Sequence, residues 1–318
     1  MNITKLLIKG QQTLNAERAK GDEDKRGILR GGSAGAIIDG QVYGNCARIH
    51  YLRTKGVEIK PDLNTQVMFD SGIANEDSVF KVLSAALPKG YKLLREEEIP
   101  VTWDTNDFKA TGRPDMVYVD ENDKPVLGLE LKSISSIYTA RNIIANKKPS
   151  SSHLIQAGFY SYRLGAQNSI DPIPYKLIYS SSPYWHLSTI GKTVADEFAG
   201  SKDVEMKNNR PFRVLPTRKV FDLSWQSGVL HYKPEHADEW KATLLTIESI
   251  NLYYNTVALM GKTKTLPPLP TDLNLVGNKE YSPCQYCELA KVCNKTREFD
   301  KWYDEVVMAV NSINSEKD

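Results

Sequence analysis

The strongest hydrophobic pattern in the chain lies between residues 65 and 87. Its apolar residues recur at helical spacing: Phe69, Ile73, Phe80, Leu83 and Leu87. Because residues three and four positions apart share a helix face, this pattern predicts an amphipathic helix over 65–87. Pro88-Lys89-Gly90 marks the end of the helix, since proline and glycine do not continue one.

The segments after this helix have the composition and alternation of strands. Strands are expected near 91–102, 107–119 and 125–133, and another over Tyr175–Tyr179. Helices are expected over 1–20, just after Cys46, and over 152–164, 234–258 and 297–314, with a Gly-rich loop over 21–40 and a stiff proline linker over 265–270. Residues 180–230 give no clear pattern. The order helix, strands, helix, strand predicts an α/β core flanked by helical termini.

Composition places the chain among ordinary globular proteins. It has 318 residues, 41% of them hydrophobic, and 41 Lys+Arg against 39 Asp+Glu give a net charge of +2. These proportions exclude a mostly disordered chain, a collagen and a coiled coil. No apolar run approaches the ~18 residues that span a bilayer, and the N-terminal MNITKLLIKGQQ lacks the apolar stretch of a signal peptide. We therefore expect a cytoplasmic protein with no membrane partner.

Three of the four cysteines lie close together near the C-terminus. Cys284, Cys287 and Cys293 have a spacing that suits one soft metal centre and is too tight for a simple disulfide framework. Cys46 is the remaining thiol and the candidate fourth ligand. Four thiolates suit Zn²⁺ or an iron–sulfur cluster, and the residues alone do not separate the two. The alternative is that the cysteines are buried single thiols.

Residues 126–132 alternate in the manner of a strand. Three leucines form the face expected to be buried: Leu127, Leu129 and Leu131. Glu130 and Lys132 share the opposite face, since successive strand residues point to opposite sides. Gly128 lies on that same face and leaves space where a ligand could approach.

Asp115 is expected opposite Glu130. The turn between their strands falls at Asn122 and Asp123, and pairing about that point aligns the two carboxylates at about 5 Å between β-carbons. Carboxylates at that distance repel unless a cation lies between them, and Mg²⁺ or Mn²⁺ takes such oxygen ligands. The alternative is a solvated hairpin with a surface Glu–Lys pair.

Glu76 falls within the apolar face of the predicted 65–87 helix. A carboxylate in that position is costly unless it is paired or bound to a metal, so Glu76 is a candidate third acidic ligand. Its neighbour Asn75 points off this face. The alternative is a glutamate at the edge of the face whose side chain reaches solvent.

The predicted 152–164 helix carries a polar ridge with one aromatic residue: His153, Gln156, Tyr160 and Arg163. Such a ridge suits phosphates and stacked bases, although an ordinary exposed face would look the same. Upstream, Arg141, Lys147 and Lys148 lie in a serine-rich segment that suits a mobile loop over a backbone-binding groove. A second basic run, Lys202 to Lys219, holds six basic residues, and such runs are usually solvated faces.

The motifs, taken in chain order, resemble those of the RecB-like branch of the PD-(D/E)xK nucleases. The matching pieces are Gly72-Ile73-Ala74-Asn75-Glu76, Gly112-Arg113-Pro114-Asp115, Glu130-Leu131-Lys132, Gln156-Ala157-Gly158-Phe159-Tyr160, the segment Tyr43–Arg48 around the first cysteine, and the three C-terminal cysteines. Within that branch the chain is most similar to the iron–sulfur CRISPR-associated exonucleases and their phage relatives. The match anchors roughly residues 43–165 and 265–295.

The resemblance implies a fold and an activity. The fold would be a restriction-endonuclease-like core, a mixed sheet flanked by helices, over 61–230. Helical segments over 1–60 and 231–318 would be joined by a four-cysteine [4Fe–4S] cluster rather than by Zn²⁺. The activity would be Mg²⁺- or Mn²⁺-dependent exonuclease cleavage of DNA, on single strands or free ends, in DNA repair or recombination.

The resemblance also implies residue roles. Asp115, Glu130 and the carbonyl of Leu131 would hold the metal ion, Lys132 would orient or polarise the attacking water, and Gln156 and Tyr160 would lie beside the DNA, with His153, Lys147 and Lys148 as further DNA-binding candidates. The family commonly has a metal-binding histidine where this chain has Asn75. Phage-type relatives instead use a glutamate at the spacing of Glu76.

Two other functions are compatible with the same residues. The first is a catalytically weak DNA-binding or assembly module of the same fold, acting with CRISPR spacer-acquisition or recombination proteins, and Asn75 is its best support. The second is a zinc-stabilised protein with no nuclease role, in which the Asp115 hairpin is only surface.

Overall fold

The computed structural model describes most of the chain. The described residues are 13, 28–30, 34–44, 46–134, 136–181, 185–187, 195–198, 201–215, 217–267, 287–293 and 298–317. The helix expected over 1–20 lies outside these ranges apart from residue 13, as do Cys284 and residues 268–270 of the proline linker.

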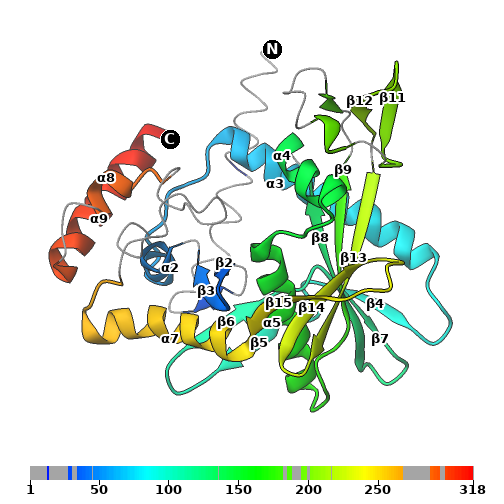
Figure 1. The fold of residues 1–318 in the computed structure, drawn as a ribbon. Helices are drawn as coiled ribbons and strands as arrows, with labels where there is room; N and C mark the ends of the chain where they lie inside the picture. The colour runs from blue at the N-terminus through cyan, green and yellow to red at the C-terminus, as the bar shows by residue number, and fades with distance from the viewer. Residues whose placement is uncertain are drawn as a thin grey trace.

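A seven-stranded mixed sheet forms the centre of the molecule (Figure 1). Its strands, in spatial order, are β15 (Lys241–Thr246), β14 (Val229–Pro234), β13 (Thr217–Gln226), β9 (Tyr175–Ser181), β8 (Pro125–Ser133), β7 (Met116–Val119) and β4 (Lys92–Arg95). β8 and β9 are parallel, and the other neighbouring pairs are antiparallel. The expected α/β core with a mixed sheet is confirmed, and the boundary expected at residue 230 falls inside β14.

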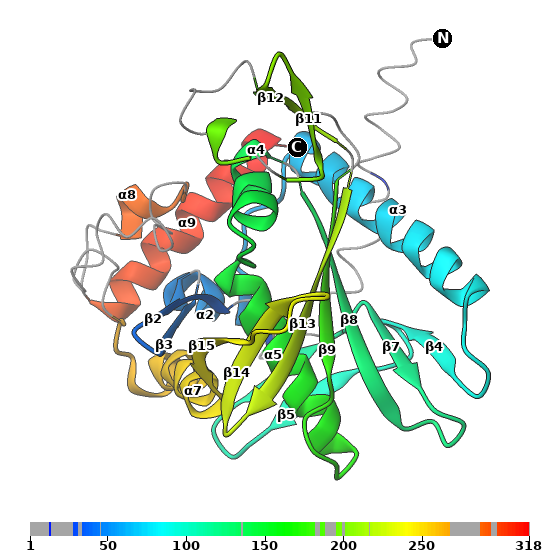
Figure 2. The same ribbon diagram turned by 45° about the vertical axis from the view of Figure 1, so that its right-hand side comes forward.

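Helices cover both faces of this sheet (Figure 2). α3 (Leu63–Ala85) packs on one face through a small apolar cluster: Val79, Leu93, Met116, Leu129 and Leu131. α5 (Ser151–Gln167) packs on the other face, where its residues Leu154, Ile155 and Phe159 join the main core. Both helices were predicted from the sequence to within a few residues. Among the described helices, none is long and apolar enough to cross a membrane.

Only part of α3 is covered by the sheet. The helix begins at Asp62, whose side chain accepts a hydrogen bond from the backbone N–H of Thr65 at 2.7 Å. Phe80 contacts the apolar cluster, whereas Phe69 and Ile73 are 54% and 43% exposed. The predicted apolar face is therefore half covered, because a 23-residue helix of about 34 Å is longer than the stretch that the sheet supports.

Smaller elements from both ends of the chain pack beside the core. β1 (Leu29–Arg30), β6 (Lys109–Gly112) and β5 (Val101–Asp104) form one sheet, and β2 (Ala34–Ile38) pairs with β3 (Gln41–Gly44). They are accompanied by α2 (Ala47–Thr54), α7 (Ile247–Thr263), α8 (Ala290–Cys293) and α9 (Phe299–Lys317). Tyr51 of α2 meets Phe299 of α9 with ring centroids 5.7 Å apart, so N- and C-terminal segments share a core.

Near the end of the central sheet lie α4 (Ile137–Ala140), the π-helical turn η3 (Arg141–Ala145) and a small separate sheet. That sheet has the order β10 (Trp185–His186), β12 (Arg210–Val214) and β11 (Val204–Lys207). In Figure 1 the β11–β12 hairpin projects at the upper right, beyond the ends of β9 and β13.

The expectations for residues 21–40 and 234–258 are wrong in part. The loop expected over 21–40 includes β1 and β2, and β2 turns into β3 through Asp39 and Gly40, both with positive φ. An Asp-Gly pair suits a two-residue hairpin turn, a signal that the surrounding glycines obscured. The helix expected over 234–258 begins only at Ile247, because Lys241–Thr246 pairs with β14 as β15.

Candidate active site

The hairpin of β7 and β8 brings Asp115 and Glu130 to the same end of the central sheet. Met116 pairs with Leu129 and Val117 with Gly128, so the register predicted from the turn is confirmed over this stretch. The register shifts only near the turn, where Val119 pairs with Pro125. The side chain of Asp115 accepts a hydrogen bond from the backbone N–H of Leu131 at 2.6 Å, which fixes the carboxylate beside β8.

Glu130 is fully buried and carries an unsatisfied oxygen. Its Oε1 accepts a hydrogen bond from Lys132 Nζ at 2.5 Å, whereas Oε2 has no hydrogen-bond partner among the described residues. The leucine face of β8 is also buried, under α3, so the strand is covered on both sides. Burial raises the pKa of Glu130, and the positive charge of Lys132 offsets only part of that effect.

Asp115 lies close enough to Glu130 for the two charges to repel. Burial raises the pKa of Asp115 well above its usual range, Glu130 raises it further, and Lys132 and the Leu131 N–H act in the opposite direction. Burial alone would lower the pKa of Lys132, but Glu130 and Asp115 outweigh burial and raise it. Lys132 therefore remains a protonated ammonium group at neutral pH.

Glu76 of α3, the predicted third acidic ligand, lies near enough to Asp115 for their charges to interact. Burial and the charge of Asp115 raise the pKa of Glu76 to about 7, while Lys132 and Arg95 lower it. Glu96 is a neighbour that sequence reasoning missed. It follows β4 in a turn, and its charge adds to the effect of burial on the pKa of Glu76, Asp115 and Glu130. The sequence signal for an acidic neighbour is the run of three glutamates at 96–98, which lies in a segment expected to be a strand.

We expect Glu76 to make the metal-free protein progressively less stable, relative to Glu76→Gln, as pH rises from about 4.5 to about 7. Glu76 keeps its proton in the folded protein up to a pKa of about 7, whereas the unfolded chain releases it near 4.5. Between these values the folded state binds more protons, so raising the pH favours unfolding. Because Glu76 is only half-buried, the effect is about 1–2 kcal/mol. Thermal unfolding in EDTA measures the difference between the wild-type and Glu76→Gln midpoints, which should shift against wild type over this range; a difference that stays constant or shifts the other way would contradict the prediction.

The space expected above Gly128 is filled. A β-carbon at Gly128 would lie 2.0 Å from the ring of Tyr175, which is buried and whose hydroxyl donates to the Leu129 carbonyl at 3.4 Å. Gly112 is constrained in the same way by Tyr160, at 2.3 Å. These glycines therefore admit tyrosine rings from β9 and α5 rather than a ligand.

Gly128→Ala is expected to lower the free energy of unfolding by about 1–3 kcal/mol, because the added methyl group must displace a buried ring. Gly72→Ala in α3 is the matched control, since nothing lies within 4 Å of its β-carbon position. The control should raise stability by up to about 1 kcal/mol through helix propensity. Urea unfolding of both variants checks this, and equal midpoints would contradict it.

The polar ridge predicted on α5 is partly buried beside the carboxylates. Gln156 Nε2 donates to the Tyr160 hydroxyl at 3.3 Å, and the Tyr160 ring is almost fully buried. His153 Nδ1 lies 2.9 Å from the Tyr179 hydroxyl. Burial and the charge of Lys132 lower the pKa of His153 to about 3, so this histidine is neutral. The ridge lines the site but presents less surface than an open DNA-binding face would.

Lys147 and Lys148 are exposed between η3 and α5. The segment before them is not the loop we expected, because it forms α4 and η3. Its Arg141 is paired with Glu197 through two nitrogen–oxygen contacts, one of them 2.5 Å long. Lys147 and Lys148 therefore lie at the end of α5 nearest the carboxylates, whereas Arg141 is held by its ion pair with Glu197.

The three described cysteines meet on the other side of the molecule. Cys46 precedes α2 and Cys293 ends α8, and the pKa of each of these two thiols is raised by burial and by the nearby Cys287. Burial is the largest cause, and it raises the pKa of Cys293 to about 11. Trp302 Nε1 donates to Cys293 Sγ at 3.3 Å. The segments that the four-cysteine prediction joins are therefore adjacent.

Arg48 connects the same segments through its buried guanidinium. Its Nη1 donates to the Cys293 carbonyl at 3.1 Å, and its Nη2 donates to the Pro267 carbonyl at 2.8 Å. The group lies 6.0 Å from the ring centroid of Trp302. The positive charge of Arg48 acts on Cys46 and Cys293 and favours their thiolate forms, which are the forms that bind iron or zinc.

The donor sets of both sites fit the predicted metals. Carboxylate oxygens are the preferred ligands of Mg²⁺ and Mn²⁺, and a cation would satisfy Glu130 Oε2 and relieve its repulsion with Asp115. Thiolates suit an iron–sulfur cluster or Zn²⁺. Within the ranges that the structure describes, no three His, Cys, Asp or Glu side chains are already arranged around a metal position. The fit therefore depends on donor chemistry and on the unsatisfied oxygen.

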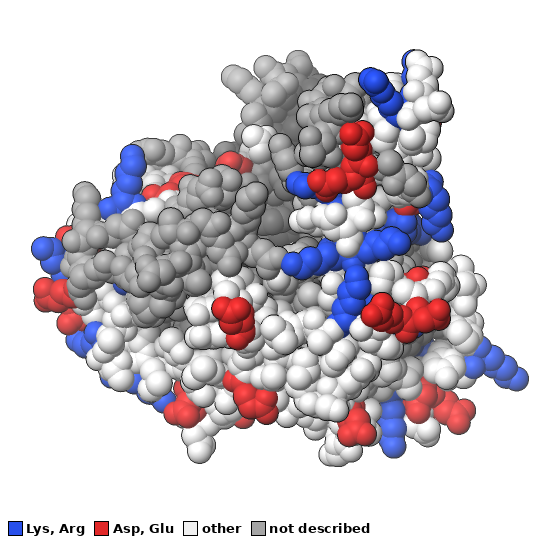
Figure 3. Space-filling model, viewed as in Figure 1, with Lys and Arg blue, Asp and Glu red and all other residues white. Residues whose placement is uncertain are grey.

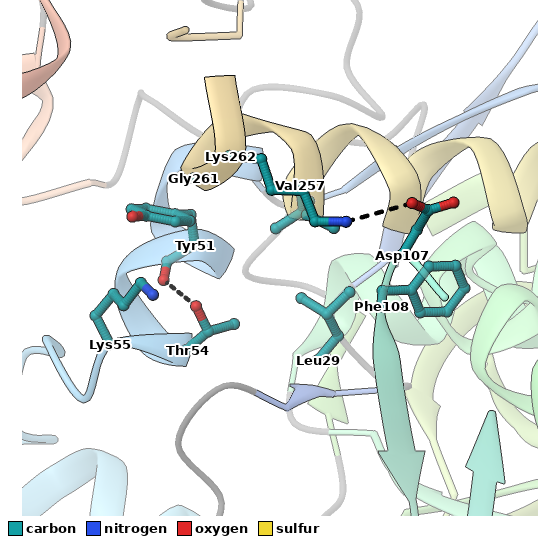
Figure 4. A pocket seen from close by; sticks show the side chains of 10 residues that line it. Leu29, Tyr51, Thr54, Lys55, Asp107, Phe108, Val257, Gly261 and Lys262 are labelled. Atoms are coloured by element: carbon teal, nitrogen blue, oxygen red, sulfur yellow. Dashed lines mark hydrogen bonds and ion pairs between the residues drawn. The ribbon is translucent and has the colours of Figure 1, made fainter. Parts of the chain in front are cut away.

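A cavity of about 300 Å³ lies between α2 and α7, away from the carboxylates (Figure 4). Lys262 spans its edge and pairs with Asp107 at 3.3 Å. The cavity is lined by Leu29, Tyr51, Thr54, Lys55, Asp107, Phe108, Val257, Ala258, Gly261 and Lys262. Because no predicted catalytic residue lines it, the cavity is not part of the carboxylate site.

Comparison with known proteins finds distant structural likeness and no match in sequence. No family model matches the chain, and no curated protein matches it. A solved structure described as "Crystal structure of SSO0001" has a TM-score of 0.44 and 11% sequence identity, over 92% of this chain and 98% of that chain. This distant likeness assigns no activity.

Proposed function

We propose that the protein is a divalent-metal-dependent deoxyribonuclease that hydrolyses phosphodiester bonds, acting as an exonuclease on single-stranded DNA or free ends. The observation that carries this proposal is the group formed by Asp115, Glu130 and Lys132, with an unpartnered carboxylate oxygen buried at its centre. A buried, unsatisfied carboxylate is costly for stability alone, so its retention favours a role in binding a cation.

Each side chain has a role in this reaction. Asp115, Glu130 and Glu76 would hold Mg²⁺ or Mn²⁺, with the Leu131 carbonyl as a further ligand. When bound, the ion supplies a water of lowered pKa and neutralises charge on the phosphate. Lys132 stays protonated, so it stabilises negative charge near the scissile phosphate rather than accepting a proton. Gln156 and Tyr160 limit the space beside the carboxylates and help to position the strand.

The cysteine site has a structural role in the same proposal. Cys46, Cys287 and Cys293, together with Cys284, would hold a [4Fe–4S] cluster, with Zn²⁺ as the alternative. Arg48 and Trp302 stabilise this region through hydrogen bonds to Cys293. Protein purified under anaerobic conditions should be brown with a cluster and colourless with zinc, and metal analysis separates the two directly.

Digestion of 5′- and 3′-end-labelled DNA by the wild-type protein tests the proposed activity. Single- and double-stranded substrates are compared with Mg²⁺, Mn²⁺ or EDTA, and the order of products gives the polarity. Cleavage that requires the divalent ion supports a nuclease. DNA binding without cleavage would instead support an assembly module that acts with CRISPR or recombination proteins.

A further inference from the structure

The β11–β12 hairpin is a rigid projection that carries basic residues. Its turn, Asn208 and Asn209, has φ of 52° and 58°, the conformation of the tight turns that match strand twist. Phe212 is flanked by two cations, with Lys207 Nζ at 5.1 Å and the Arg213 guanidinium at 5.9 Å from its ring centroid. These contacts stiffen the hairpin and cover the aromatic ring.

The base of the hairpin is fastened to the central sheet. Asp203 is 9% exposed and accepts hydrogen bonds from Thr217 Oγ1 at 2.7 Å and from Ser201 Oγ at 3.2 Å. It also forms an ion pair with Lys219 of β13, and its carbonyl accepts from the Leu215 N–H at 2.8 Å. The hairpin therefore keeps a fixed direction relative to β13.

This attachment lies at the same end of the sheet as the carboxylates. Lys219 pairs with Tyr179 of β9, and Tyr179 pairs with Lys132 of β8. Because neighbouring strands are about 4.8 Å apart, Lys219 lies two strands, or roughly 10 Å, from Lys132. Figures 1 and 2 show the hairpin extending outward from this end.

The tip of the hairpin offers positive charge to solvent. Lys207 and Arg210 flank the turn, both are exposed, and within the described ranges neither has a carboxylate partner. Arg213 differs, because its Nε donates to Glu205 at 2.6 Å. From Asp203 to Lys207 the strand reaches about 13 Å, so the tip lies a few nucleotides of an extended DNA strand from the carboxylate site. In Figure 3, Lys and Arg side chains project over this hairpin at the upper right.

We propose that the β11–β12 hairpin binds the phosphodiester backbone of the DNA strand whose end lies at the carboxylate site. This rests on the proposed nuclease function. Lys207 and Arg210 contact phosphates a few nucleotides away from the cleaved bond. Because two cations already contact the ring of Phe212, the hairpin reads the backbone rather than the bases, and its binding is independent of sequence.

The test is binding of fluorescent single-stranded DNA of 20 nucleotides, in EDTA so that no cleavage occurs, by wild type and by Lys207→Ser/Arg210→Ser. The double variant should bind at least ~10-fold more weakly at 100 mM salt, and its log Kd against log salt should be shallower by about 1.4, for two phosphate contacts. The loss should be several-fold smaller with a dinucleotide, which is too short to reach from the site to the tip.

The matched control is Lys92→Ser/Lys124→Ser, which removes two exposed lysines at the opposite end of the sheet, Lys92 at the start of β4 and Lys124 in the turn between β7 and β8. This control should bind like wild type. Equal affinity and salt dependence for the hairpin variant and wild type would overturn the inference, as would wild-type protein that binds no DNA. If the wild type binds DNA without cleaving it and the hairpin variant loses that binding, the inference stands and only the nuclease proposal is refuted.

Discussion

Glu130→Gln is expected to lower the rate of DNA cleavage by at least ~1000-fold, equivalent to about 4 kcal/mol of transition-state stabilisation. The variant keeps the size of a side chain that is fully buried, so folding should be retained. It loses the negative charge that pairs with Lys132 and that would bind the divalent ion. Single-turnover digestion of end-labelled DNA with Mg²⁺ and with Mn²⁺ measures the effect, and a thermal melt establishes that the variant folds.

Lys132→Met is the companion variant, because it keeps both carboxylates and removes only the ammonium group. Its rate should fall by about 100-fold, as for the loss of one preorganised electrostatic group, while Mn²⁺ binding stays within a few-fold of wild type. Glu130→Gln should instead weaken Mn²⁺ binding and cleavage together. Wild-type cleavage by folded Glu130→Gln would refute the assignment of the site.

Cys46→Ser is expected to give protein that is largely insoluble or that unfolds well below the wild-type temperature. Structural metal sites can contribute ~10 kcal/mol or more, which is comparable to the net stability of a whole domain. Loss of one ligand would release the cluster and separate α2 from α8 and α9. Iron and sulfide content, visible absorbance and the midpoint of thermal unfolding measure the outcome.

Tyr43→Phe is a suitable control for the cysteine substitution, because it lies three residues away and removes only a hydroxyl group, which donates to Gln41 Oε1 at 3.0 Å. It should keep the metal content and the melting temperature of wild type. A folded Cys46→Ser protein with wild-type iron or zinc content would show that Cys46 is not a ligand.

The sequence predicted the carboxylate hairpin because its two determinants are local. The alternation of β8 places Glu130 and Lys132 on one face, and the turn at residues 122 and 123 sets the register that aligns Asp115 with Glu130. Glu76 was predicted from a charge within an apolar helix face. All three inferences use neighbours within one or two elements, where spacing alone decides which side chains meet.

The missed features depend on contacts between distant elements. Nothing near Gly128 indicates that Tyr175 occupies the adjacent space, since that ring comes from β9. Lys241–Thr246 is a strand because β14 offers it an edge, although a segment of that composition also suits a helix. Glu96 reaches the site only because a turn after β4 carries it there. The order of hydrophobic and polar residues within one segment does not show which distant segments it will contact.

Arg48 makes hydrogen bonds that can form only late in the synthesis of the chain. Its hydrogen-bond acceptors, the carbonyls of Pro267 and Cys293, lie 219 and 245 residues further along, whereas the bond between Asp115 and Leu131 spans only 16. Contacts between residues close in sequence can form early. Contacts between residues far apart in sequence form only after the intervening chain has been made. The carboxylate hairpin can therefore assemble on a nascent chain still attached to the ribosome, while the cysteine region closes only after nearly the whole chain has emerged.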